Sequence, residues 1–468
     1  MAEHVSADYR SRSLWLDLLA AESPDALRPR PPLDGDTQCD VAIAGAGLTG
    51  LWTAYYLAVA DPSLRIVVAE RDIAGFGASG RNGGWASAGI AGSPSRYARR
   101  HGIDAVRRAT RATNDAVDEI GRVAAAEGIE CHFAKRGSLT VATSEPQRDR
   151  LLAAHDAARR NGTHNDDDQM LDVDGVRHYA TVSGVLAGAF TPHGAGIDPA
   201  RLTRGLAAAC ERRGVRIVEH TEALELLPGQ LRTTHGVISA DVVLRSTESY
   251  TVQLPGHRRD YLPLTSLMIA TEPLPAEVWD QLGWPRGLTM KDKRHLFFYA
   301  QRTADDRIAI GGRGAPYSLR RPMDPARETD QGVRDRLVNV IRTHFPAAAD
   351  AAITHRWGGT LAVPRDWTCA VHFDPATRTG WAGGYSGHGV VAAHLSGRTL
   401  ADLVLGRATD LTAMPWVGHR SRRWEPEPLR WIASRSIVQV LGSADRHEDA
   451  SGIAARRVRL IRRWLPPS

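Results

Sequence analysis

The sequence predicts an α/β fold in which a domain with a parallel sheet is interleaved with an α+β domain built on a mixed, largely antiparallel sheet. Two observations predict the first domain. A short apolar strand at residues 41–44 runs into a glycine-rich turn and a helical pattern, and a second apolar strand follows at residues 64–69. A strand, a glycine turn and a helical pattern then recur at residues 380–405. The chain therefore leaves the first sheet and returns to it near its end.

The first turn has the spacing Gly-x-Gly-x-x-Gly at Gly45, Gly47 and Gly50. The first glycine permits a tight turn, the second lets the backbone approach a pyrophosphate, and the third lets the helix pack closely on the strand. Leu48 and Thr49 lie within the turn, where the start of the helix offers backbone N–H groups to phosphate. The spacing alone is weak evidence, because a glycine-rich turn can also form without a ligand.

An acidic residue, Glu70, ends the second strand, 20 residues beyond Gly50. At this distance a carboxylate can accept hydrogen bonds from both hydroxyls of an adenosine ribose, and it repels a 2′-phosphate. The combination of strand, glycines, helix, second strand and terminal acid therefore favours FAD or NAD over NADP.

The segment after Glu70 distinguishes FAD from NAD. An NAD-binding domain normally continues into further strand–helix units, whereas residues 75–84 hold five glycines and suit neither a long helix nor a core strand. Such a run lets backbone amides lie against a flat ring; a surface loop without a ligand is the alternative. The FAD contacts predicted in this region are Arg71, Gly77, Ala78, Ser79, Arg81, Asn82, Gly83 and Gly84.

A third glycine-rich turn, Gly-Gly-Tyr-Ser-Gly-His-Gly at residues 383–389, precedes a helical pattern. The start of a helix favours negative charge, and a reduced flavin is an anion at its pyrimidine end. This helix is therefore expected to stabilise the reduced cofactor. The FAD contacts predicted here are Gly384, Gly387, His388, Gly389 and Val390.

Together these elements resemble the D-amino-acid-oxidase-like (DAO) superfamily of FAD-dependent amine and amino-acid oxidoreductases, which includes glycine oxidase, monomeric sarcosine oxidase and γ-glutamylputrescine oxidase. The matching segments are residues 45–50, 70–71, 77–84, 303–312, 356–359 and 384–389. The Ser-Gly-Arg-Asn-Gly-Gly form of the loop is most similar to the γ-glutamylputrescine oxidase branch. The resemblance implies an FAD-binding Rossmann-like domain of the glutathione-reductase type, with the backbone near Ala223 against the adenine.

The positions of the flavin elements divide the chain into segments. The predicted FAD-binding domain comprises residues 40–95, 195–255 and 350–410, and the predicted substrate domain comprises residues 96–194 and 256–349. Residues 1–39 form an N-terminal arm. Residues 411–468 form a C-terminal strap with a basic helix at residues 453–465.

Composition predicts a cytoplasmic enzyme. The sequence has no apolar run of the length that spans a membrane and no secretory signal pattern. Its formal charge of +6 does not indicate nucleic-acid binding, because acids and bases are mixed along the chain. The cysteines at positions 39, 131, 210 and 369 have neither metal-ligand nor disulfide spacing. We therefore expect reduced thiols, no metal, and FAD held noncovalently; the oligomeric state is not predicted.

C–N oxidation by a flavin requires little acid–base catalysis from the protein. Oxidation of a C–N bond requires a neutral amine, because the nitrogen lone pair assists as hydride leaves the adjacent carbon. The protein positions that carbon and excludes water, so no strong base is required. The imine product hydrolyses in water, and the electrons pass to dioxygen or another acceptor. Candidate catalytic residues are His388, Tyr385, Trp357 and Arg302, with Arg313 as a further candidate.

Three departures from the family limit this interpretation. In sarcosine oxidase a lysine holds the substrate carboxylate, and the corresponding position here is Val391, so we expect amines without a carboxylate on the reacting carbon. Lysines that assist dioxygen in relatives have no evident counterpart among Lys135, Lys291 and Lys293, the three lysines of the chain. Arg245 places a bulky charge near the adenine end. An FAD-dependent amine oxidase, a dehydrogenase that uses a quinone or carrier, and a non-catalytic flavoprotein acting through partners all remain open.

Overall fold

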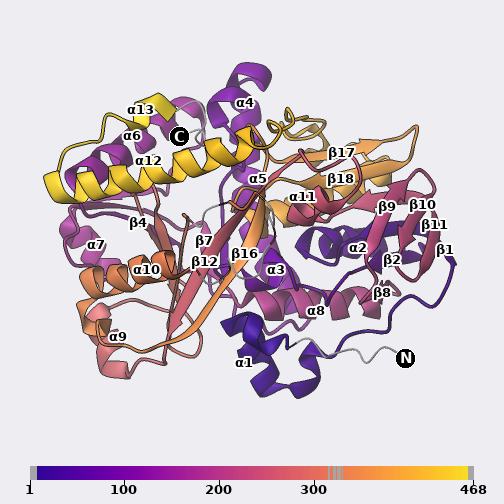
Figure 1. Cartoon of the computed structure of the whole chain (residues 1–468), viewed down its shortest axis with the longest axis horizontal. Helices are drawn as coiled ribbons and strands as arrows, with labels where there is room; N and C mark the ends of the chain where they lie inside the picture. Colours follow the sequence, from indigo (N-terminus) through magenta and orange to yellow (C-terminus); the bar gives the residue numbers. More distant parts are fainter. Residues whose placement is uncertain (1–7, 315–316, 320–322, 324–327, 329, 462–468) are drawn as a thin grey trace.

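The computed structural model describes residues 8–314, 317–319, 323, 328 and 330–461, and it contains two eight-stranded sheets, each with helices packed against it (Figure 1). A small third sheet is formed by β3 (Trp85–Ser87) and β7 (Gly194–Gly196). β3 contacts helix α11 (Gly389–Val404), and β7 contacts β13 (Thr289–Asp292). The small sheet therefore connects the two larger ones.

The first sheet has the strand order β17-β18-β11-β1-β2-β8, and all neighbours in it are parallel except β17 and β18. Its strands are β1 (Thr37–Ala44), β2 (Ile66–Ala69), β8 (Arg216–Val218), β11 (Gly236–Arg245), β17 (Ala370–Asp374) and β18 (Thr379–Gly383), with β9 (Ala223–Leu227) and β10 (Gln230–Thr233) added through β11. The predicted apolar strands are buried, as expected for a parallel sheet covered by helices.

One hydrophobic core joins this sheet to four helices. Trp52 of α2 (Leu48–Ala60), Val117 of α5 (Ile103–Ala126), Leu206 of α8 (Pro199–Arg212) and Leu395 of α11 all belong to it. α2 and α11 lie against each other, so the helices that follow the first and last glycine turns begin at the same edge of the sheet. That edge is where the strands of a parallel sheet present their carboxyl ends.

The second sheet has the order β16-β12-β15-β14-β13-β4-β6-β5, and only its β13–β4 pair is parallel. Its strands are β4 (Ser138–Ala142), β5 (Gln169–Leu171), β6 (Ala187–Thr191), β12 (Leu262–Thr271), β13, β14 (Phe298–Arg302), β15 (Ile308–Gly312) and β16 (Ile353–Val363). The predicted α/β fold with a mixed, largely antiparallel second sheet is therefore confirmed.

The structure differs from the predicted segment boundary at residue 350. β16 pairs with β12 from Leu262↔Val363 to Thr271↔Ile353, so it belongs to the second sheet. The chain returns to the first sheet only at β17. Apolar strands of similar composition occur in both sheets, and the sequence does not show which long-range partner each strand finds.

The remaining helices lie around the sheets: α1 (Leu14–Glu22), α3 (Ala78–Arg81), α4 (Pro94–His101), α6 (Glu145–Asn161), α7 (Val173–Tyr179), α9 (Ala276–Leu282), α10 (Gln331–His344), α12 (Leu429–Ser451) and α13 (Val458–Ile461). α12 crosses the second-sheet half of the molecule (Figure 1), where Asp445 accepts hydrogen bonds from the backbone N–H groups of His295 and Leu296. The predicted basic helix at 453–465 is only partly present: residues 453–457 are not helical, residues 458–461 form α13, and the remainder lies outside the described residues. Among those described, no helix is both long and apolar enough to span a bilayer.

Candidate active site

A cavity of about 320 Å³ is lined by residues of both large sheets. From the first sheet it is lined by the turn after β1, the end of β2 and the start of α11; from the second it is lined by Ser266, Lys291 and Tyr299. Ligands of open parallel sheets bind outside the carboxyl ends of the strands, and the cavity has this position.

The β1–α2 turn depends on its glycines. Gly45 has a φ of +101°, and a Cβ on Gly50 would lie 2.0 Å from the carbonyl oxygen of Gly45. Only glycine therefore lets α2 start so close to the turn. A Cβ on Gly47 would lie 2.9 Å from Ser79 Oγ, and the Leu48 N–H donates to the same oxygen at 2.9 Å. Ser79 of the glycine loop (residues 75–84) therefore contacts the first turn beside the cavity.

Glu70 lines the cavity at the end of β2 and is held by two backbone donors. Its Oε2 accepts from the Ala46 N–H at 2.8 Å, and its Oε1 accepts from the Asp72 N–H at 3.1 Å. Each oxygen retains a lone pair for a further donor, which fits the two hydroxyls of a ribose. Burial raises the pKa of Glu70 to about 7, against the lowering effect of the two hydrogen bonds. Nearby, the Arg71 guanidinium lies 4.4 Å from the centre of the Tyr250 ring.

The Asn82 side chain stabilises the glycine loop through hydrogen bonds to the loop backbone. Asn82 accepts from the Gly84 N–H at 2.8 Å through Oδ1, and its Nδ2 donates to two carbonyls of α3. Gln301 of β14 donates to the Gly83 carbonyl at 2.9 Å. Asn82 therefore shapes the loop chiefly by holding its backbone, while a residue of the second sheet fixes the end of the loop.

Several buried polar atoms at the cavity lack partners. Arg81 is 3% exposed, pairs with Glu328 at 2.9 Å and lies 4.9 Å from the Phe76 ring centre. Among the described residues, its Nε has no hydrogen-bond partner, and neither have Trp85 Nε1 and Ser246 Oγ. All three residues line the cavity. Orphaned buried polar atoms are uncommon, and these fit a polar ligand such as the phosphates or flavin ring of FAD.

Two predicted catalytic residues, Tyr385 in the turn before α11 and His388 at its N-cap, line the cavity. The Tyr385 hydroxyl shares a hydrogen bond with Thr49 Oγ1 at 2.8 Å, and burial raises its pKa, so the phenol is neutral. His388 is the N-cap residue of α11. Burial, together with the charges of Lys291 and Arg313, lowers the pKa of His388 to about 4. His388 is therefore neutral at physiological pH.

Two cationic residues of the second-sheet half line the same cavity. Lys291 lies on β13, and burial lowers its pKa. Arg313, at the end of β15, donates to the Ser386 carbonyl at 2.7 Å and lies 5.0 Å from the Phe297 ring centre. Sequence reasoning gave Arg313 little weight and missed Lys291. A signal for Lys291 was present, since it is one of three lysines and stands in a strand whose other residues are buried.

Trp357 and Arg302 are not among the cavity-lining residues. Trp357 is 2% exposed, and its Nε1 donates to the Arg81 carbonyl at 2.8 Å, so it supports the glycine loop from behind. Arg302 lies 4.3 Å from the Trp279 ring centre and donates to Asp306 at 2.8 Å. Its side chain is therefore used in packing the second sheet.

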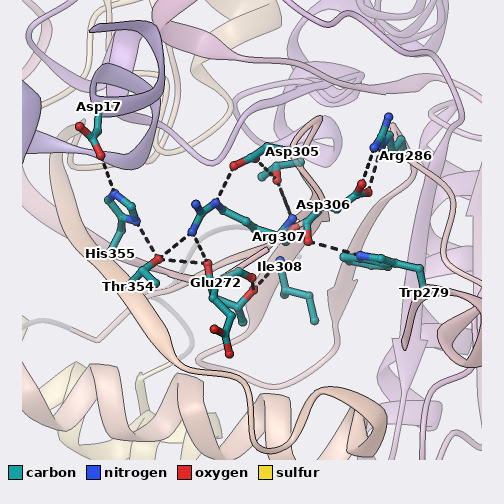
Figure 2. A network of polar contacts seen from close by, with 12 residues as sticks. Asp17, Glu272, Trp279, Arg286, Asp305, Asp306, Arg307, Ile308, Thr354 and His355 are labelled. Carbon is teal, nitrogen blue, oxygen red and sulfur yellow. Dashed lines mark hydrogen bonds and ion pairs between the residues drawn. The ribbon is translucent and has the colours of Figure 1, made fainter. Parts of the chain in front are cut away.

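Figure 2 shows the polar network to which Asp306 belongs. Arg307, in the same turn between β14 and β15, donates to Thr354 Oγ1 of β16 at 2.9 Å. The neighbouring His355 contacts Asp17 of α1 at 3.1 Å. The network ties the N-terminal helix to the second sheet, which gives the region around Arg302 a structural role.

The other predicted contacts divide between lining and shaping the cavity. Those that line it are Gly45, Gly47, Leu48, Thr49, Glu70, Arg71, Gly77, Ala78, Ser79, Arg81, Asn82, Gly83, Ala223, Gly387, His388, Gly389 and Val390. Gly50, Gly84 and Gly384 are not among the lining residues; the last two have φ values of +72° and +82°. Arg245 also lies outside the lining, with its guanidinium 5.3 Å from the Trp381 ring centre.

Comparison with known proteins decides the family. The model of the DAO family, described as FAD dependent oxidoreductase, matches residues 40–403. The chain belongs to this family. The predicted family, fold class and FAD cofactor are thereby confirmed, and this DAO-family protein is an FAD-dependent oxidoreductase.

The relatives of this DAO-family member include proteins of matching length. Gamma-glutamylputrescine oxidoreductase of Escherichia coli K12 is 29% identical over 436 residues, which cover 90% of this chain and 96% of that protein. A probable oxidoreductase, OrdL, of Haemophilus influenzae is 29% identical over 391 residues, covering 80% and 85%. The crystal structure of glycine oxidase from Geobacillus kaustophilus superposes with a TM-score of 0.68 at 20% identity, covering 82% of this chain and 99% of that one. The last similarity shows the shared fold.

Proposed function

We propose that this enzyme oxidises a C–N bond of an amine or amino acid by hydride transfer to FAD, giving an imine that hydrolyses, with dioxygen as the electron acceptor. When bound, FAD supplies the hydride acceptor. Glu70 would hold the ribose, the β1–α2 turn the pyrophosphate, and the start of α11 the pyrimidine end of the flavin. Similarity to a gamma-glutamylputrescine oxidoreductase over 90% of the chain supports an amine as substrate.

The observation that carries the proposal is the positive charge around His388. Lys291, Arg313 and His388 line the same cavity, and Arg313 donates to the carbonyl of Ser386, two residues before His388, at 2.7 Å. The two positive charges contribute to the lowered pKa of His388. Positive charges disfavour a further cation, so a bound amine loses its proton more readily there. C–N oxidation requires that neutral amine. The neutral imidazole of His388 can then accept a hydrogen bond from the amine N–H.

Two further features support the acceptor and the mode of FAD binding. Dioxygen gains negative charge as it is reduced, and the charges of Lys291 and Arg313 favour that change. All four cysteines are free, buried thiols, and none belongs to the cavity lining. We therefore propose that FAD is held without a covalent bond.

An anaerobic screen of the FAD-loaded protein tests the proposal. Sarcosine, glycine, D-alanine and a set of mono- and diamines are mixed with the protein, and loss of the visible flavin absorbance is recorded. At least one amine should bleach the flavin, and admission of air should yield hydrogen peroxide equimolar with oxidised amine. Bleaching without peroxide would replace dioxygen by a quinone or carrier acceptor. No bleaching by any amine would contradict C–N oxidation, and yellow colour in the acid-precipitated protein would contradict noncovalent binding.

A further inference from the structure

Glu248 has a backbone conformation that is uncommon for its residue type. Its φ is +43°, at the first position of the short 3-10 helix η3 (Glu248–Gln253) that follows β11. Glycine is the usual residue in this region, because a Cβ is unfavourable there. Of the described non-glycine residues with a positive φ, Glu248 is the one that lines the cavity. A strained residue at such a place is a candidate for a functional role.

The carboxyl group of Glu248 binds the turn that precedes α11. Its Oε2 accepts from the Gly384 N–H at 2.8 Å, and its Oε1 accepts from the Tyr385 N–H at 3.3 Å. Burial raises the pKa of Glu248 to about 7, whereas backbone hydrogen bonds from Gly384, Tyr385 and Ala362 lower it. Ala362 belongs to β16 of the second sheet. The side chain therefore connects the end of β11, the turn after β18 and the second sheet.

The turn fits closely against this carboxyl group. A Cβ on Gly383 would lie 2.6 Å from Glu248 Oε2, so glycine is required for the approach. The His388 N–H donates to the Tyr385 carbonyl at 3.0 Å, within the same turn. Tyr385 and His388 both line the cavity. Glu248 thus holds the backbone of Tyr385, and Tyr385 holds the backbone of His388.

Arg245, one of the departures from the family, lies in the same segment, three residues before Glu248. It is 7% exposed, and its guanidinium lies 5.3 Å from the ring centre of Trp381, its neighbour on β18. The charge of Arg245 also lowers the pKa of Glu248. Arg245 and Glu248 thus place opposite charges against β18 and the turn that follows it. An opposite charge nearby offsets part of the cost of burying a carboxylate.

We propose that Glu248 is a positioning residue, which fixes the turn before α11 and thereby places His388 against bound FAD. Its effect on FAD binding depends only on the FAD cofactor of the family, whereas its effect through His388 rests on the proposed function. Glycine would suit the backbone better at this position. The hydrogen bonds of the carboxyl group, rather than the direction of the chain, therefore account for Glu248.

FAD titration of matched variants tests the positioning role without turnover. Glu248→Met keeps the length of the side chain but offers no acceptor oxygen, so FAD affinity should fall about tenfold, the value of one lost hydrogen bond. Glu248→Gln keeps one acceptor for the Gly384 N–H, and its affinity should stay within about threefold of the wild type. Glu248→Gly suits the backbone and should lose as much affinity as Glu248→Met.

Arg378→Gly is the control for the backbone. Arg378 also has a positive φ, +51°, but it is exposed in the turn before β18 and does not line the cavity. Its FAD affinity should equal that of the wild type. The visible circular dichroism of bound FAD should weaken in Glu248→Met and recover in Glu248→Gln, because only the second variant still holds the turn. Equal FAD affinity in Glu248→Met and Glu248→Gln, or wild-type affinity in Glu248→Gly, overturns the proposal.

Anaerobic flavin reduction by the best amine tests whether Glu248 acts through His388. With FAD and amine saturating, Glu248→Met should slow the limiting rate about tenfold. In the His388→Ala background the same change should slow it by less than about threefold, because the imidazole that Glu248 positions is gone. Equal slowing in both backgrounds overturns the action through His388. If no amine reduces the flavin, the proposed function fails, and the FAD affinities of Glu248→Met and Glu248→Gln still decide the role of Glu248.

Discussion

The two sides of the cavity are built in different ways. On the first sheet, short continuous segments form the wall: the turn after β1, the glycine loop and the start of α11. Backbone groups and glycines form much of that wall. On the second sheet, single side chains come from separate strands, Ser266 from β12, Lys291 from β13 and Tyr299 from β14. The wall proposed to bind the cofactor is therefore encoded locally, whereas the wall proposed to face the substrate depends on how distant strands pair.

The largest effect should come from the backbone of the cofactor side. In Gly50→Ala the new Cβ would meet the Gly45 carbonyl oxygen at 2.0 Å, so α2 must move away from the turn. Such overpacking costs about 3 kcal/mol, or about a hundredfold in FAD affinity if the turn is displaced. FAD titration by fluorescence measures it. Gly332→Ala is the control, since its nearest neighbour would be an Asp330 oxygen at 3.5 Å. Equal FAD affinity in the two variants would contradict the role of Gly50.

A smaller loss is expected from Glu70, which is proposed to hold the ribose. Glu70→Ala removes two charge-assisted acceptors, and FAD affinity should fall about ten- to a hundredfold. Because burial raises the pKa of Glu70 to about 7, the carboxyl is protonated below that pH and its acceptor strength falls. Wild-type FAD affinity should therefore weaken as pH decreases from about 8 to 6, and this dependence should be absent from Glu70→Ala. An unchanged dissociation constant would mean that the adenosine end is held elsewhere.

How much of the molecule the sequence predicts follows from this contrast. The parallel core, the glycine turns and Glu70 are signalled by residue types within short windows, because the geometry they form is local. The sequence analysis grouped residues 353–363 with the first sheet, whereas they form β16 of the second sheet, paired with β12 residues that lie 82 to 101 positions earlier. Apolar alternation alone does not show that β16 pairs with β12.

The substrate side shows the same limit at the level of single residues. Arg302 and Lys291 both stand in strands of the second sheet, yet only Lys291 lines the cavity. Which face of a strand meets the cavity depends on register and on neighbouring strands. Trp357 belongs to a matching family segment but supports the loop through its indole N–H. A motif thus predicts the location of a residue better than its contact.

A moderate effect on the chemical step is expected from His388. In His388→Ala, FAD should remain bound and flavin reduction by the best amine should slow about tenfold, the value of one lost hydrogen bond. Since the pKa of His388 is lowered to about 4, the imidazole is protonated only at lower pH. In the wild type, the rate of flavin reduction should not change near pH 6.5. In both proteins the rate should rise with pH through the pKa of the substrate amine. A rate change near pH 6.5 that is present in the wild type and absent from His388→Ala would show that His388 titrates there and would contradict its lowered pKa.

The smallest effect on catalysis should come from Arg302. Its guanidinium is held by Asp306 and Trp279, within the packing of the second sheet, and it does not line the cavity. Because the side chain is partly exposed to solvent, Arg302→Met should cost only about 1 kcal/mol of folding free energy. Anaerobic flavin reduction should remain within about twofold of the wild type, since no group near the reacting carbon changes. A tenfold slower reduction in a variant that unfolds at the same temperature as the wild type would place Arg302 in the chemistry, and substrate recognition would then extend beyond the cavity wall.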